Sequence, residues 1–153
     1  MERFKKKNNK LSFIQGRRLA REYAMQVLYM IDVIKYTPED ALEIFWKHFT
    51  EVEKKTVIEY ASDLVMGTFN NIKEIDELIE SHAKNWIIKR MAFVDRNILR
   101  FAIYELTRRS DIPRKVSINE AIEVAKKFGN TDSNKFVNGI LDKITVMKKG
   151  VLK

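Results

Sequence analysis

The sequence predicts an all-α protein, and three observations support this prediction. Apolar residues recur at the i, i+3, i+4, i+7 spacing of one helix face along most of the chain. The sequence lacks stretches of useful length in which apolar and polar residues alternate as in a β-strand. A chain of 153 residues can also bury a sizeable core without disulfides, and it contains no cysteine. We therefore expect six to seven helices packed as a bundle.

The first half of the chain predicts three or four of these helices. Residues 18–35 carry a helical apolar stripe and form the first helix. Thr37 suits the N-cap of a shorter second helix, and a proline follows it at the first helical position. Residues 53–84 continue the helical pattern, with a break expected near Gly67 or Asn71. This stretch forms one long helix or two consecutive helices.

The second half predicts three more helices. One begins near Asp95, whose carboxylate suits the positive end of the helix dipole, and ends after a pair of arginines. Ser117 and Glu120 have the spacing of a capping box, and Gly129 suits the C′ position at the end of the same helix. The last helix covers about residues 132–147.

The positive charge is concentrated at both ends of the chain. The formal net charge is +8, and residues 1–22 hold eight basic and two acidic side chains. Residues 143–153 hold four basic and no acidic side chains, whereas the sequence between these ends has a small negative net charge. Basic ends of this kind favour binding to a polyanion such as RNA. Two alternatives are ends that only solubilise the protein, and a membrane-binding helix, which would need an apolar face that the first helix uses for the core.

The sequence contains little that an enzyme or a cofactor site needs. His48 and His82 are far apart and show no metal-ligand spacing. The glycines form no phosphate-binding loop, and no serine lies in a nucleophile elbow. We therefore expect a non-catalytic protein without cofactor or metal. The missing signal peptide, long apolar segment and cysteines favour a soluble, cytoplasmic protein.

Three arginines gather at the start of the first helix. Arg17, Arg18 and Arg21 have spacings that allow several guanidinium groups to share one side of a helix. Arginine pairs with phosphate in a bidentate manner and stacks on bases, so this cluster is a candidate RNA site. The alternative is a solvated helix end with no ligand.

The stretch "FGNTDSNKFVNGIL" predicts a second candidate site. Lys135 and Phe136 follow a helix start at Asp132, where free backbone N–H groups favour an anion. Phe136 lies at the edge of the apolar stripe, so its ring either completes the core or stacks on an unpaired base. The Asp132 carboxylate either caps the helix or contacts a base edge. Gly139 costs about 1 kcal/mol relative to alanine inside a helix, and close helix packing is the favoured reason for it.

Two blocks, "RRLAREYAMQVLY" and "DRNILRFAIYELTRRSDIPRKVSINEAIEVAKKFGNTDSNKFVNGILDKI", resemble the NusB family of bacterial transcription antitermination factors. The resemblance extends over nearly the whole chain. It implies an all-helical fold of two small bundles. It also implies binding to single-stranded boxA RNA in nascent rRNA operon transcripts, together with the ribosomal small-subunit protein that acts as NusE. The resemblance further implies that the protein acts on RNA polymerase only indirectly, as part of the antitermination complex.

The resemblance also implies roles for particular positions. The residues that match RNA-binding positions of the family are Arg17, Arg18, Arg21, Asp132, Lys135 and Phe136. Two further residues, Tyr29 and Asp95, match family positions that are tied to binding of NusE and to assembly of the RNA complex. We expect residues 1–15 to form a flexible basic extension, residues 16–148 a single RNA-binding helical domain, and residues 149–153 a basic tail.

Several alternatives stay open at this point. A similar helical domain precedes the catalytic domain of an rRNA cytosine methyltransferase family, but the end of the chain at Lys153 favours a freestanding factor. A helical protein-binding scaffold is the alternative function. The sequence leaves undecided whether the free protein forms a homodimer, and whether the N-terminal lysines Lys5, Lys6 and Lys7 touch RNA.

Overall fold

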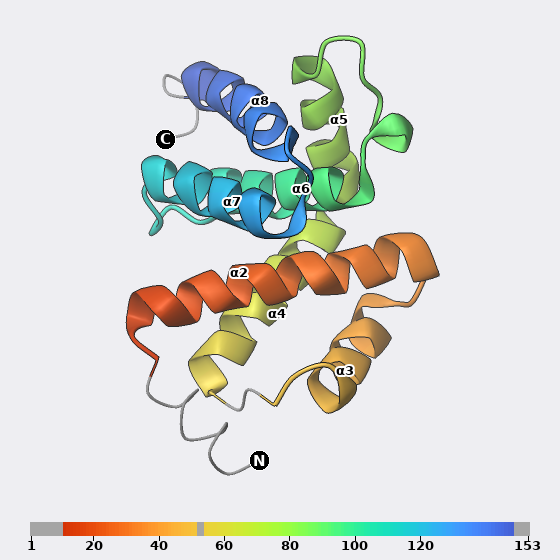
Figure 1. Cartoon of the computed structure of the whole chain (residues 1–153), viewed down its shortest axis with the longest axis vertical. Coiled ribbons are helices and arrows are strands. Elements are labelled where there is room, and N and C mark those ends of the chain that lie inside the picture. The colour runs from red at the N-terminus through yellow and green to blue at the C-terminus, as the bar shows by residue number, and fades with distance from the viewer. Residues whose placement is uncertain (1–10, 52–53, 149–153) are drawn as a thin grey trace. The chain divides into compact units, whose positions relative to one another are not determined.

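The computed structural model describes residues 11–51 and 54–148, which contain seven α-helices and no β-strand (Figure 1). The helices are α2 (Phe13–Tyr29), α3 (Pro38–His48), α4 (Lys55–Asn70), α5 (Ile72–His82), α6 (Phe93–Arg108), α7 (Arg114–Phe128) and α8 (Ser133–Lys148). The π-helical turn η1 (Met30–Ile34) follows α2, and the 3-10 turn η2 (Ile88–Arg90) precedes α6. The all-α prediction is confirmed.

The chain divides into two compact units, Met1–Met66 and Gly67–Lys153, and the division falls inside α4. Unit 1 contains α2, η1, α3 and most of α4, whereas unit 2 contains the end of α4 and the helices α5 to α8. The predicted N-terminal extension, except for its last residues, and the predicted C-terminal tail lie outside the described residues.

Helix α2 begins at Phe13 rather than near Arg18, because a capping box starts it earlier. The Ser12 hydroxyl accepts a hydrogen bond from the Gln15 backbone N–H at 3.2 Å. In return, Gln15 Oε1 accepts one from the Ser12 N–H at 2.9 Å. This reciprocal pair satisfies two N–H groups that would otherwise lack partners at the helix start.

The predicted first helix also ends differently, because its last turn is π-helical. The wider π turn changes the angular spacing of side chains, so the apolar stripe no longer faces the core. Ile34, which the periodicity placed on the buried stripe, is accordingly 54% exposed. Lys35 then adopts a left-handed conformation with φ of 71° and ends the segment.

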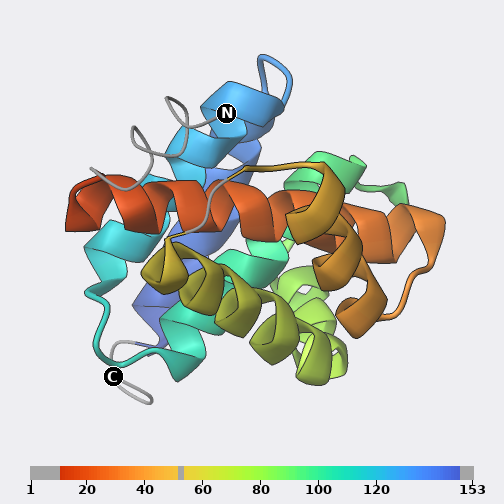
Figure 2. The same ribbon diagram turned by 90° about the horizontal axis from the view of Figure 1, so that it is seen from below.

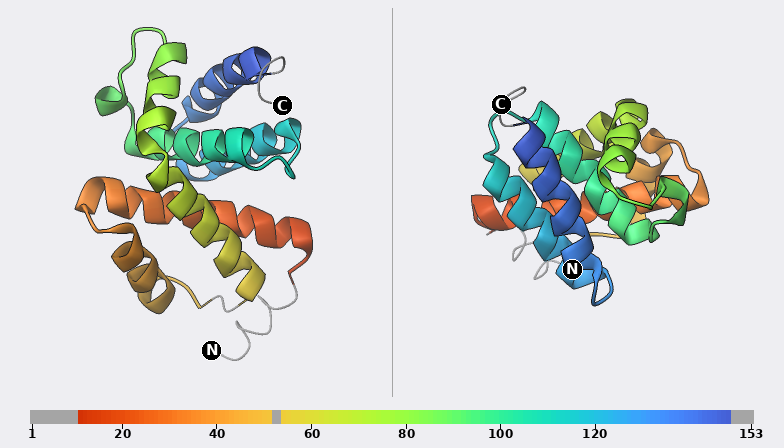
Figure 3. Two further views of the ribbon diagram at one scale, coloured as in Figure 1. Left: turned by 180° about the vertical axis from the view of Figure 1, so that it is seen from behind. Right: turned by 90° about the horizontal axis from the view of Figure 1, so that it is seen from above.

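An aromatic cluster joins α2 to α3 within unit 1. The Tyr23 ring meets Phe45 at 5.2 Å and Trp46 at 5.7 Å between centroids, both edge-to-face. Thr37 caps α3 as predicted, since its hydroxyl accepts from the Asp40 N–H at 3.2 Å. The left view of Figure 3 shows α4 running across α2, and Figure 2 shows the same two helices inclined to each other.

Unit 2 is built around α6, which is buried over its whole middle part. Helices α5, α7 and α8 all pack against α6 (Figure 3). The buried stripe predicted for the last helix is confirmed, and its members are Val137, Ile140, Leu141 and Ile144. The alternative of two consecutive helices over residues 53–84 is also confirmed, with the break at Asn71.

The capping box predicted at Ser117 is wrong. Helix α7 begins at Arg114, with Pro113 in an extended conformation at the N-cap. Ser117 is buried inside the helix, and its hydroxyl donates to Glu105 Oε1 of α6 at 2.7 Å. The hydroxyl is therefore used to satisfy a buried carboxylate rather than a helix terminus.

The C′ role predicted for Gly129 is wrong as well, because its backbone is extended, with φ of −87° and ψ of −175°. Glycine is required at this position because a residue with a Cβ atom would not fit. A Cβ at this position would lie 2.8 Å from the Ala125 carbonyl oxygen and would collide with the Ser133 side chain.

The two helical glycines Gly67 and Gly139 have opposite surroundings. A Cβ on Gly67 would overlap the ring of Tyr104, so this glycine allows α4 and α6 to approach closely within unit 2. A Cβ on Gly139 would meet no atom within 4 Å. The prediction that helix packing explains Gly139 is therefore wrong, and the surface of α8 is open at this residue.

We expect Gly139→Ala to raise the free energy of unfolding by about 0.5 to 1 kcal/mol, because alanine restricts the unfolded chain and clashes with nothing. The matched substitution Gly67→Ala should lower it by about 1 to 3 kcal/mol through overpacking against Tyr104. Urea denaturation of both variants measures these changes. Equal shifts in the two variants would contradict the difference in surroundings.

Candidate nucleic-acid interface

Arg17 and Arg21 converge on one aromatic ring in unit 1. The guanidinium carbon of Arg17 lies 3.8 Å from the centroid of Tyr60, and that of Arg21 lies 5.6 Å from the same centroid. The guanidinium carbon of Arg17 also lies 4.8 Å from the centroid of Phe13. Tyr60 is a buried residue of α4. The predicted sharing of one helix side is therefore confirmed for Arg17 and Arg21, and cation–π contacts orient both groups.

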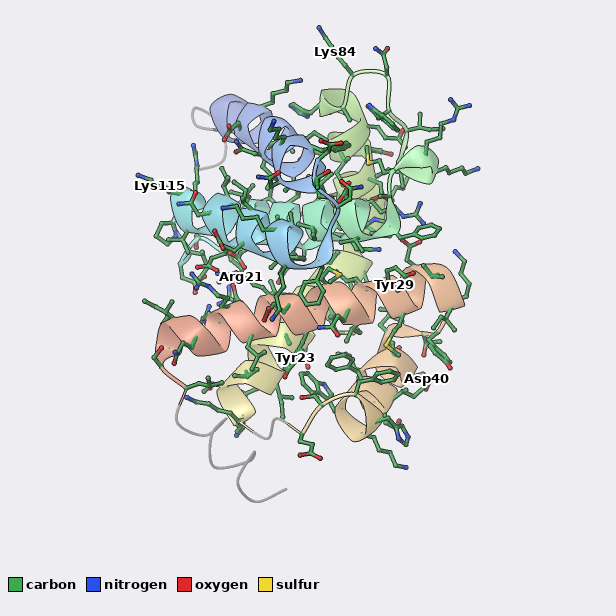
Figure 4. All side chains as sticks on the ribbon, viewed as in Figure 1. Arg21, Tyr23, Tyr29, Asp40, Lys84 and Lys115 are labelled. Atoms are coloured by element: carbon green, nitrogen blue, oxygen red, sulfur yellow. The ribbon has the colours of Figure 1, made fainter. Side chains whose placement is uncertain are left out.

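The three arginines differ strongly in exposure. Arg18 is exposed and Arg17 is half-buried. Arg21, which is labelled in Figure 4, is only 3% exposed. The alternative of a solvated helix end therefore does not hold for Arg21, whose side chain lies inside the protein near the Tyr60 ring. The Nη1 atom of Arg17 is buried and finds no hydrogen-bond partner among the described residues.

The start of α8 is capped by residues other than Asp132. The Ser133 hydroxyl accepts from the Asn130 N–H, and Asn130 Oδ1 accepts from the Asp132 N–H, each at 2.9 Å. The Asp132 side chain is exposed. Asn130 and Ser133 thus fill the capping role that the sequence allowed for Asp132, and the Asp132 carboxylate faces solvent beside exposed Lys135.

Phe136 is half-buried and has an aromatic neighbour that the sequence analysis missed. Its ring lies edge-to-face with Trp86, at 5.9 Å between centroids and 88° between planes. Trp86 is 50% exposed. The signal that would have indicated Trp86 is its sequence context, "KNWIIKR", in which a tryptophan lies between basic residues. Helical periodicity does not reveal it, because the residue belongs to a loop.

Tyr29 lies at the end of α2 (Figure 4), and further exposed apolar residues follow it closely in the sequence. It is 36% exposed, and Val33, Ile34 and Tyr36 are exposed by a similar amount or more. We call these four residues the Tyr29 patch. Apolar residues grouped on a surface in this way are typical of a protein-binding site.

Asp95 lies in the first turn of α6, which begins at Phe93. The residue is 7% exposed, and its Oδ1 has no hydrogen-bond partner within the described part of the chain. A buried carboxylate at this position benefits from the positive end of the helix dipole.

Metal binding and membrane insertion find no support in the described residues. Residues 11–51 and 54–148 contain no group of three or more His, Cys, Asp or Glu side chains that could hold a metal ion. Within the same ranges, none of the helices has the length and apolar character needed to cross a membrane.

The family model described as the NusB family matches residues 18–146, which is most of the chain. The chain belongs to the NusB family. The transcription antitermination protein NusB of Myxococcus xanthus (strain DK1622) is 48% identical over 133 residues, which cover 86% of this chain and 95% of that protein. Because NusB relatives are transcription antitermination proteins, the expectation of a non-catalytic protein is confirmed.

Solved NusB structures have the same fold. T. maritima NusB is 39% identical and gives a TM-score of 0.76, with 85% of this chain and 90% of that chain covered. A structure described as antitermination factors NusB and NusE in complex with dsRNA is 30% identical, with a TM-score of 0.81. It covers 88% of this chain and 99% of that chain. The NusB resemblance seen in the sequence is therefore confirmed.

We expect Arg21→Ala to lower the free energy of unfolding by about 1 to 3 kcal/mol, because a buried side chain and its ring contact are lost. Arg18→Ala should change it by less than about 0.5 kcal/mol, because Arg18 is exposed. Urea denaturation monitored by circular dichroism compares the two variants. A stability of Arg21→Ala equal to that of Arg18→Ala would contradict the burial of Arg21.

Proposed function

We propose that this NusB-family chain is a non-catalytic RNA-binding antitermination factor in the cytoplasm. It binds single-stranded boxA-type RNA in nascent rRNA operon transcripts, together with the ribosomal small-subunit protein acting as NusE, and so supports read-through by RNA polymerase. The observation that carries this proposal is the likeness to NusB in the NusB–NusE complex with dsRNA, over 88% of this chain. Because that complex is described with dsRNA, the strandedness of the RNA needs its own test.

In this proposal each unit has RNA-binding residues of its own, and those of unit 1 lie on α2. Arg17, Arg18 and Arg21 supply positive charge from α2. The exposed Arg18 pairs with phosphate, and the half-buried Arg17 adds positive charge beside it. The buried Arg21 contributes its charge and holds Tyr60 in place.

The proposed RNA-binding residues of unit 2 lie at the start of α8. Lys135 neutralises phosphate, the exposed Asp132 carboxylate accepts from a base edge, and Phe136 offers a ring for stacking. Asp132 is available for this role because Asn130 and Ser133 cap the helix. Gly139, one turn further along α8, leaves open surface for a close approach of the sugar-phosphate backbone.

The Tyr29 patch forms the proposed NusE side. Its exposed apolar side chains suit burial against a folded protein better than contact with phosphate. We assign Asp95 to assembly of the RNA complex, and its buried carboxylate favours the start of α6.

The deciding experiment measures binding to a boxA-type RNA strand, to a scrambled strand and to the corresponding duplex, each with and without the NusE-type protein. RNA affinity should fall with salt, with a slope of about −0.7 in log K against log salt for each phosphate contacted on a single strand. A protein-binding scaffold with merely solubilising ends would bind the NusE-type protein and show no sequence-dependent RNA binding.

We predict that Phe136→Ala lowers RNA affinity by about tenfold or more, because stacking of one base contributes about 1 to 3 kcal/mol. Phe136→Tyr keeps the ring and should retain most binding. The half-buried ring implies only a moderate loss of stability, below the about 3 to 5 kcal/mol of a fully buried phenylalanine. Filter binding and urea denaturation separate these effects. If the RNA affinity of Phe136→Ala is unchanged while its free energy of unfolding falls by more than about 3 kcal/mol, Phe136 belongs to the core.

We predict that Tyr29→Asp weakens binding to the NusE-type protein by at least about tenfold, because it places a charge in an apolar interface. The helical circular dichroism signal should stay largely intact, since Tyr29 is exposed. Phe49→Asp is the matched control, because Phe49 is an exposed aromatic of unit 1 outside the Tyr29 patch. Equal losses in both variants would show that the effect is not specific to the patch.

A further inference from the structure

Trp86 is exposed although it is one of only two tryptophans in the chain. It is 50% exposed, whereas Trp46 packs with Tyr23 and Phe45 in the aromatic cluster of unit 1. Tryptophan has the largest apolar surface of any side chain, and leaving half of it in water forgoes much of the stabilisation that burial would give. We therefore consider the exposed Trp86 ring a candidate ligand-binding surface.

The arrangement of Trp86 and Phe136 suits a flat apolar ligand. Their rings are nearly perpendicular, with 88° between planes and 5.9 Å between centroids. Two perpendicular rings form a corner in which a planar molecule stacks on one ring and meets the other with its edge. An unpaired nucleic-acid base has this shape, and each base has a face that can stack.

The loop that carries Trp86 is held in place from both sides. The Trp86 N–H donates to the Ala83 carbonyl at 3.1 Å, and Asn85 between them takes a left-handed conformation with φ of 64°. Just beyond, the Ile88 N–H donates to Glu80 Oε1, and the Ile88 carbonyl accepts from Arg96 Nη1, each at 3.1 Å. The tryptophan is thus presented by an ordered loop, which reduces the entropy lost on binding.

The charge around this aromatic pair favours RNA over an apolar protein surface. Lys84, Lys89 and Arg90 are exposed on the Trp86 loop, and Lys135 is exposed next to Phe136 (Figure 4 labels Lys84). The Glu80 carboxylate, the acidic group that meets the loop, is already bound to the Ile88 N–H. Aromatic rings among lysines and arginines are the combination that single-stranded nucleic acids need, since the rings stack bases and the cations neutralise phosphates.

We propose that Trp86 is a second stacking residue, which forms with Phe136 a binding site for one unpaired base of a single-stranded RNA. This proposal rests on the RNA-binding function proposed above and adds to it the loop between α5 and η2. The site lies entirely within unit 2.

The test uses the full chain and a boxA-type single-stranded RNA oligonucleotide. Trp86→Ala should lower affinity by about tenfold, and Trp86→Phe should retain most of it because a ring remains. Phe69→Ala is the matched control, since Phe69 is a 40% exposed aromatic of unit 2 that is not part of the aromatic pair. It should bind like the parent protein.

Fluorescence gives a readout that does not depend on the stability of a variant. In a Trp46→Phe background Trp86 is the sole tryptophan, and its emission should be quenched as the RNA is added, with the same midpoint as binding. Absence of quenching in a protein that binds RNA would overturn the proposal. Unchanged affinity of Trp86→Ala, or a loss confined to binding of the NusE-type protein, would overturn it too. If the parent protein fails to bind RNA, the proposed function itself is wrong.

Discussion

The burial of α6 is the constraint on which unit 2 depends. Every residue from Asp95 to Leu106 is buried, including several with charged side chains, so these side chains need partners inside the protein. Arg100 forms two hydrogen bonds of 2.9 Å with Asp76 of α5, and Glu105 accepts from Ser117 of α7. Each pair can form only if its neighbouring helix lies in one register against α6. Polar pairing therefore fixes positions that apolar packing alone would leave adjustable.

The same principle links the core of unit 2 to its surface. Arg96 is buried in α6, yet its guanidinium reaches the Ile88 carbonyl and thereby holds the loop that presents Trp86. In unit 1 the ring of Tyr60 has a comparable role, because it orients the guanidinium groups of Arg17 and Arg21. In both units, the groups that we propose to contact RNA are ordered by neighbouring side chains before any ligand arrives, which lowers the entropic cost of binding.

The outcome for the candidate site shows which kinds of residue can be recognised without a structure. Arginines and an aromatic at helix starts are visible in the sequence, because residue type and spacing indicate them directly. The burial of Arg21 was not visible, because helical spacing does not show which residues from distant segments, such as Tyr60, a side chain meets. Trp86 was missed because it belongs to a loop without helical periodicity, and its contact with Phe136 of α8 joins segments far apart in the chain. Contacts between distant segments leave no periodic signal in either segment.

The sequence by itself determined the all-α class, the NusB family, and the helices whose ends are set by local chemistry, such as the Thr37 cap of α3. These features depend on residues within a few positions of one another, so they can be read along the chain. Only the tertiary structure decided that Ser117 serves Glu105 instead of a helix end, and that Gly67 makes room for Tyr104 while Gly139 faces open space. The physical reason is that burial and the hydrogen bonding of buried polar groups depend on which helices pack together. Helix packing is a property of the whole fold.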